Sequence, residues 1–221
     1  MPVRARLVLT FIFACCAASG TRAQEGGESQ SARHRCVRIV TTLGNIDLEL
    51  FADQAPETVR NFMANIGEKF YDGTIFHRVA ESVLIQGGGY TPDLKEKPAR
   101  PRIKNEAENG LLNVRGTIGM ARSADPDSAM SQFYINVGDN IALNHLNSTP
   151  QGFGYCVFGK VTAGMDVVDK INAARVDKGE KNENGTKSEP KLFTRDGGEI
   201  PSVEIPKETI VIKTVEELPG K

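Results

Sequence analysis

The stretch FHRVAESVLIQGG, residues 76–88, contains two short apolar runs on either side of a polar turn. Apolar runs of this length, bounded by turn residues, predict β-strands, here over 74–79 and 83–86. The two strands place a basic side chain, Arg78, and an amide, Gln86, among apolar neighbours. An arginine in a strand is ordinarily a surface residue, so this stretch indicates a functional groove only if other polar and aromatic residues join it.

The rest of the chain predicts a mainly β domain of short strands with two amphipathic helices. Pro56 suits the first turn of a helix over 56–67, where its missing N–H has no partner, and apolar residues recur at helical spacing from Val59. A second helix is expected over 165–173. Short strands with few helices are typical of a barrel or a sandwich, and the helices would cover the open ends. The other expected strands are 37–41, 45–50, 117–122, 132–137, 155–161 and 209–215.

The first 23 residues have the organisation of a secretory signal peptide. Arg4 and Arg6 precede a short apolar run, and small residues lead to Ala23, after which we expect cleavage. The apolar run is too short to cross a bilayer. The alternative is lipoprotein processing, with the protein anchored at Cys15 or Cys16.

The remaining chain has the length and composition of one globular domain. Of its 221 residues, 25% are charged and 39% hydrophobic. We expect a flexible leader over 24–35, a domain over 36–217 with a polar surface loop over 177–206, and a tail over 218–221. Removal of residues 1–23, which carry three arginines and no acid, leaves 24 basic and 28 acidic residues, a net charge of −4. This charge and the absence of Trp argue against a nucleic-acid partner.

Two cysteines, Cys36 and Cys156, remain after cleavage. An oxidising compartment would allow one disulfide, but both residues flank apolar strand-like runs, so two buried thiols fit equally well. No CxxC motif or Cys/His cluster has the spacing of metal ligands, and the three histidines are scattered. We therefore expect no metal site.

Three further blocks combine polar and aromatic residues: GTIGMAR at 116–122, SQFYI at 131–135 and VFGKV at 157–161. Together with FHRV and QGG, they occur in an order and spacing that resemble the cyclophilin family of peptidyl-prolyl isomerases, over about residues 37–215. The resemblance implies a closed eight-stranded antiparallel β-barrel with an α-helix over each end, and an enzyme without a cofactor. The later segments are most similar to bacterial secreted members, which implies a periplasmic protein, and we expect a monomer.

The reaction that the resemblance implies is rotation about the peptide bond before proline, against a barrier of about 20 kcal/mol. It assigns to Arg78 the stabilisation of the twisted amide. Gln86 would bind the substrate backbone and orient Arg78, the main chain of Arg122 would pair with the peptide before proline, and Tyr155 takes the place of a family histidine. Ala121, Ser123 and Gln132 would border a neighbouring subsite. The full set of expected substrate-binding residues is Val83, Leu84, Gln86, Ala121, Arg122, Ser123, Gln132, Phe133, Tyr134, Leu143 and Tyr155.

The sequence departs from the family's usual pattern around the expected proline pocket. Val83-Leu84 stands where the family has Phe-Met, and Tyr134 adds a hydroxyl to a phenylalanine position. Ala142 replaces a rim aromatic that donates a hydrogen bond to cyclosporin-type inhibitors. Glu81-Ser82 replaces Pro-Gly. Two functions follow: a foldase that isomerises Xaa-Pro bonds of exported proteins, or a chaperone module that binds proline-containing segments with little catalysis.

Overall fold

The structure is a computed structural model that describes residues 35–177 and 205–219, together with residue 1 and four two-residue strands between 180 and 200. The expected signal peptide, its cleavage site and the leader up to residue 34 lie outside the described residues, as do Cys15 and Cys16. The chain divides into two units, 1–31 and 32–221, and the second contains the domain that follows. No helix among the described residues is long and apolar enough to cross a membrane.

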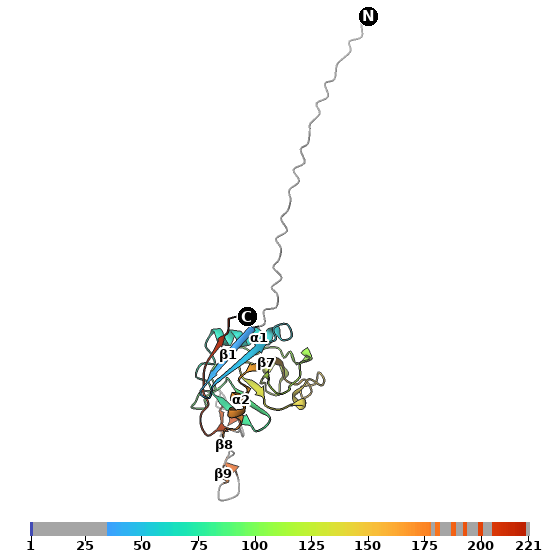
Figure 1. Cartoon of the computed structure of the whole chain (residues 1–221). Coiled ribbons are helices and arrows are strands. Elements are labelled where there is room, and N and C mark those ends of the chain that lie inside the picture. Colours follow the sequence, from blue (N-terminus) through green and yellow to red (C-terminus); the bar gives the residue numbers. More distant parts are fainter. Residues whose placement is uncertain are drawn as a thin grey trace. The chain divides into compact units, whose positions relative to one another are not determined.

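Eight antiparallel strands form the main sheet, in the order β14-β1-β2-β7-β5-β6-β4-β3 (Figure 1). Each expected strand is present, with ends that differ by a few residues from the prediction. Their bounds are β1 Arg35–Thr41, β2 Asn45–Leu50, β3 Phe76–Ala80, β4 Leu84–Gly87, β5 Thr117–Met120, β6 Phe133–Asn136, β7 Val157–Ala163 and β14 Ile212–Glu217.

The expectation of a closed barrel is wrong, because the sheet is open between its edge strands β3 and β14. One isolated bridge, between Ile75 and Val211, links the two edges ahead of β3. Backbone hydrogen bonds flank it, from Phe76 N–H to Ile210 O and from Ile212 N–H to Thr74 O. β14 itself pairs with β1, and no ladder of backbone hydrogen bonds joins β14 to β3.

The expected polar loop over 177–206 carries short paired segments. β9 pairs with β10, β11 with β12, and β13 with β8, all antiparallel. Each of these strands is two residues long: β8 Val176–Asp177, β9 Glu180–Lys181, β10 Lys187–Ser188, β11 Leu192–Phe193, β12 Glu199–Ile200 and β13 Ile205–Pro206.

Two α-helices bury their apolar stripes in one core with the sheet. α1, Pro56–Gly67, has the predicted bounds and starts at its proline, and α2 is Met165–Asn172. Figure 1 shows α1 near one end of the sheet and α2 near the other. Val59 and Phe62 of α1 and Val168 of α2 are at most 3% exposed and belong to the same core. Three 3₁₀ turns complete the described helices: Ala107–Asn109, Pro126–Ser128 and Ile141–Leu143.

Hydrogen bonds at the ends of both helices also hold neighbouring loops and turns in place. The carboxylate of Glu106 accepts hydrogen bonds from the first-turn amides of α1, at 2.8 Å for Thr58 N–H, so it caps a helix whose own N-cap, Ala55, cannot. Asn172, at the end of α2, accepts from Ser82 N–H at 3.0 Å and donates to Ala80 O at 2.9 Å. This amide therefore holds the turn between β3 and β4.

Candidate active site

Strand register brings residues of separate motifs into one row. Arg78 of β3 lies opposite Gln86 of β4, which lies opposite Tyr134 of β6, which in turn lies opposite Gly119 of β5. Neighbouring side chains along a strand alternate between faces. The row therefore faces away from the core, which contains the next residues along these strands, such as Ile135.

A hydrogen-bonded chain of side chains runs along this outer face. The Arg78 Nη1 atom donates to Gln86 Oε1 at 3.5 Å, and Gln86 Nε2 donates to Gln132 Oε1 at 3.0 Å. All three side chains are half-buried. Gly89 leaves the room that this arrangement needs, because a Cβ atom there would lie 2.4 Å from Gln132 Cγ. Gln86 can thus orient the guanidinium, as the resemblance implied.

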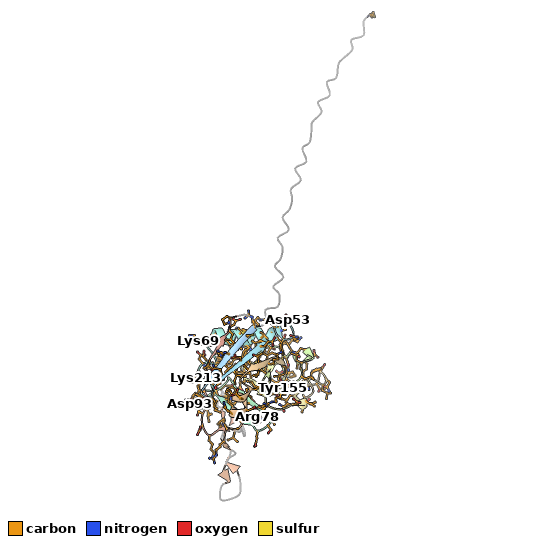
Figure 2. The ribbon with its side chains drawn as sticks, viewed as in Figure 1. Asp53, Lys69, Arg78, Asp93, Tyr155 and Lys213 are labelled. Carbon is orange, nitrogen blue, oxygen red and sulfur yellow. The ribbon has the colours of Figure 1, made fainter. Side chains whose placement is uncertain are left out.

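An apolar cluster lies on the same face beside Arg78. Ala80, Leu84 and Tyr134 are at most 7% exposed, and they pack with three half-buried residues from loops, Ala121, Leu143 and Tyr155. Three of the predicted pocket residues, Leu84, Tyr134 and Leu143, therefore come together in this cluster. Val83, in the turn before Leu84, is 40% exposed. Figure 2 shows Arg78 and Tyr155 well away from Asp53, which precedes α1.

The extra hydroxyl of Tyr134 points away from this apolar cluster. It donates to Asn113 Oδ1 at 2.6 Å, and the residue is 2% exposed. The ring lies against Gly119, where a Cβ atom would be 2.3 Å from the hydroxyl oxygen. Burial raises the pKa of Tyr134 well above its ordinary value, so the hydroxyl stays protonated and remains a donor. The phenol therefore presents only its ring to the pocket.

Asn113 is a site residue that the sequence analysis missed. It is fully buried, and its Nδ2 donates to the carbonyl oxygens of Leu143 and Tyr155, at 3.2 and 3.3 Å. Its Oδ1 also accepts from Asn136 Nδ2 at 3.2 Å. One amide thus ties β6 to two loops that carry pocket residues. A buried amide needs such partners. The one feature of the sequence that could have indicated a network of amides here is the recurrence of asparagine at 136, 140 and 144.

The Arg122 side chain fixes the Tyr155 wall of the pocket. Its guanidinium donates to Gly154 O at 2.8 Å, to Pro150 O at 3.1 Å and to Ser123 O at 2.9 Å. It also lies over the Tyr155 ring, 4.6 Å from the centroid, in a cation–π contact. The Tyr155 ring in turn meets the Tyr134 ring edge-on, with centroids 6.1 Å apart. The Arg122 guanidinium is therefore held by contacts with the protein itself.

A cavity of about 460 Å³ adjoins the Gln86–Gln132 pair. The expected subsite residues Ala121, Ser123 and Gln132 all line it, as does Arg122. The other lining residues, which the sequence analysis did not identify, are Tyr90, Glu96, Arg102, Ser128, Met130 and Ser131.

Phe133, which was expected to line or support the proline pocket, belongs to the buried core. It alternates with Tyr134 along β6 and is fully buried on the core face. Its ring packs edge-on against Phe62, Tyr71 and Phe76, with centroids 5.6–6.0 Å apart. Phe133 can therefore support the pocket only from beneath.

The two cysteines of the domain are not paired, and Cys156 is buried. Cys36 and Cys156 are thiols, not a disulfide. Burial raises the pKa of Cys156 to about 11, so this thiol stays protonated. Within 35–177 and 205–219, no group of three or more His, Cys, Asp or Glu side chains is arranged to hold a metal ion.

Comparison with known proteins identifies the family. The model of the cyclophilin-type peptidyl-prolyl cis-trans isomerase family matches residues 36–190. A peptidyl-prolyl cis-trans isomerase of Streptomyces antibioticus is 53% identical over 139 residues, 63% of this chain and 84% of that protein. Isomerase B of Escherichia coli is 55% identical over 131 residues, 59% of this chain and 80% of that protein.

A solved structure has the same fold. The cyclophilin-type isomerase of Cryptosporidium parvum superposes with a TM-score of 0.61 at 23% identity, over 85% of this chain and 99% of that one. The match of more than half the chain to the family model, and relatives above 50% identity, settle the assignment. The chain belongs to the cyclophilin-type peptidyl-prolyl cis-trans isomerases and is an enzyme of that family.

Proposed function

We propose that Arg78 is the catalytic residue of this isomerase and that it acts without a covalent intermediate. Twisting the amide breaks its resonance and returns the lone pair to the prolyl nitrogen. A fixed cation beside that nitrogen stabilises the twisted amide more than either planar isomer, and only such selective stabilisation raises the rate. A guanidinium keeps its charge at any physiological pH.

The observation that carries this proposal is the position of Arg78 between a polar chain and an apolar cluster. Gln86 holds the guanidinium from one side at 3.5 Å. The cluster of Ala80, Leu84 and Tyr134 lies on the same face and offers a surface for the proline ring. Apolar walls lower the local dielectric, which strengthens the contact between the guanidinium and the developing lone pair.

The clients that we propose are unfolded or loop segments of exported proteins, with the isomerase acting as a monomer in the periplasm. The basic and apolar run of residues 1–23 supports export, and the relatives from Acinetobacter baylyi and Escherichia coli are bacterial proteins. Mass spectrometry of the exported protein should find an N-terminus at Gln24. A lipid on Cys15 or Cys16 would replace this localisation with a membrane anchor.

A protease-coupled assay on short Xaa-Pro peptides tests the activity. The exported protein should accelerate cis-to-trans conversion in proportion to its concentration. The alternative, a chaperone module that binds proline segments with little catalysis, draws support from exposed Val83 and from Ala142, which bring no aromatic wall to the pocket. Peptide binding without measurable acceleration would favour that alternative.

A further inference from the structure

A network of buried amides lies behind the apolar cluster beside Arg78, and Asn113 is at its centre. The Asn113 Nδ2 atom donates to the carbonyl oxygens of Leu143 and Tyr155, at 3.2 and 3.3 Å. Both of these residues belong to the cluster. Since the accepting oxygens belong to the main chain, the amide fixes the backbone from which both pocket side chains extend.

The backbone of Asn113 holds the Leu143 loop at two further points. Its carbonyl oxygen accepts from Asn140 N–H at 2.7 Å, and its own N–H donates to Asn144 Oδ1 at 2.7 Å. Asn140 and Asn144 directly precede and follow the 3₁₀ turn Ile141–Leu143. One residue therefore holds both ends of the turn that carries Leu143.

The network continues to Val83, an expected pocket residue in the turn before β4. Asn136 Nδ2 donates to Asn113 Oδ1 at 3.2 Å, and Asn140 Nδ2 donates to Asn136 Oδ1 at 2.7 Å. Asn140 Nδ2 also donates to Val83 O at 2.9 Å. Asn113 and Asn136 are fully buried, so loss of a partner there leaves a polar group without hydrogen bonds to water. The amides thus couple the Val83 turn to the Leu143 loop.

The charged group of the proposed mechanism is held by a separate set of hydrogen bonds. Arg78 donates to Gln86 at 3.5 Å, and Gln86 donates to Gln132 at 3.0 Å. The amides around Asn113 therefore position apolar walls, whereas the glutamines position the guanidinium.

We propose that Asn113 is a positioning residue of the isomerase: it fixes the walls of the proline pocket and so determines the affinity for Xaa-Pro segments. The proline ring contacts these walls in both planar isomers and in the twisted amide, so the walls supply uniform binding. Loss of uniform binding raises KM and leaves kcat unchanged. The inference rests on the proposed function, because it seats the proline ring in the cluster beside Arg78.

The test compares Asn113→Ala with the unmodified protein on a short peptide that contains an Ala-Pro bond. The isomerisation assay gives KM and kcat, and calorimetric titration gives the dissociation constant. We expect KM and the dissociation constant to rise by about tenfold and kcat to stay within about twofold, because the displaced walls no longer fit the ring.

Asn144 offers a second pair of variants at a half-buried position, where folding is less sensitive than at the fully buried Asn113. Asn144→Ala removes the oxygen that accepts from Asn113 N–H, and it should raise KM by about threefold, the effect of one hydrogen bond. Asn144→Asp keeps an accepting oxygen in that place, so it should restore the KM of the unmodified protein. If Asn113→Ala does not fold, this pair decides the inference.

Asn65→Ala is the matched control for lost stability. Asn65 is also a fully buried asparagine, and its Nδ2 donates to the carbonyl oxygen of Asn61 at 2.9 Å. It lies in α1, outside the pocket cluster. The variant should unfold at a lower urea concentration and keep both KM and kcat.

The kinetic constants separate failure of this inference from failure of the proposed function. Unchanged KM and dissociation constants in folded Asn113→Ala and Asn144→Ala would overturn the inference, as would an equal rise of KM in Asn65→Ala. A fall in kcat without a change in KM would also contradict it. If the unmodified protein accelerates no peptide, the proposed catalysis fails, and the dissociation constants of the same variants still decide whether Asn113 fixes the pocket.

Discussion

Replacing Tyr134 by phenylalanine separates the two roles that the structure gives to this residue. The hydroxyl donates to Asn113 Oδ1 at 2.6 Å, where both residues are buried, and Asn136 at 3.2 Å is the remaining donor to that oxygen. Losing the better of two hydrogen bonds at a buried acceptor costs about 1–2 kcal/mol of unfolding free energy. For a domain of this size that corresponds to a melting temperature lower by about 3–6 °C.

Activity should respond differently, since the ring and not the hydroxyl faces the pocket. We expect Tyr134→Phe to keep kcat/KM within about twofold. Urea unfolding and the isomerisation assay on the same preparation measure the two effects. Unchanged stability of Tyr134→Phe, or a tenfold loss of kcat/KM, would refute this account of the hydroxyl.

Three other predictions concern the surroundings of the site. Burial lowers the pKa of His77 from 6.5 to about 3. Between these two pH values the imidazole is protonated in the unfolded chain but neutral in the folded protein. The unfolding free energy therefore falls by about 1.4 kcal/mol for each pH unit below 6.5. His77→Phe should flatten the decline of unfolding free energy between pH 6.5 and 5, and an unchanged slope would contradict this. Ser82 has a φ of 60°, so Ser82→Gly should raise unfolding free energy by about 0.5–1 kcal/mol in urea titrations; destabilisation would argue against strain there. Cyclosporin should bind the unmodified protein about a hundredfold or more weaker than Ala142→Trp, because a ring and a hydrogen bond are absent; equal titrations would show that Ala142 is not at the rim.

Local patterns were sufficient to predict the eight strands of the main sheet and both α-helices. Helix α1 begins at Pro56 and ends at Gly67 as predicted, because proline placement and the apolar stripe are both local signals. The open edge between β3 and β14 could not be predicted in this way. Closure of the barrel would require β14 to pair with β3 as well as with β1, and no pattern within β3 or β14 tells whether it does.

The candidate site was predicted through motifs, and the residue that this prediction did not include belongs to contacts between distant segments. Arg78 and Gln86 lie on paired strands, so their proximity follows from a short stretch. Asn113 contacts residues 21 to 42 positions away, and nothing local marks it as a partner of Tyr134. Phe133 was expected to line or support the proline pocket, because motif resemblance identifies neighbours along the chain without stating which face each side chain occupies.

The central claim is that the charge of Arg78 stabilises the twisted amide, and the isomerisation rate of Arg78→Ala tests it most directly. We expect kcat/KM to fall by about a hundredfold or more, equivalent to about 3 kcal/mol, with little change in unfolding free energy. Arg78→Lys should also be poor, because a point charge cannot replace the planar guanidinium. Arg35→Ala is the matched control, since Arg35 is an exposed arginine whose ion pair with Glu217 lies on other strands, and it should keep full activity. If Arg78→Ala retains most of the activity of the unmodified protein, the proposed mechanism is wrong.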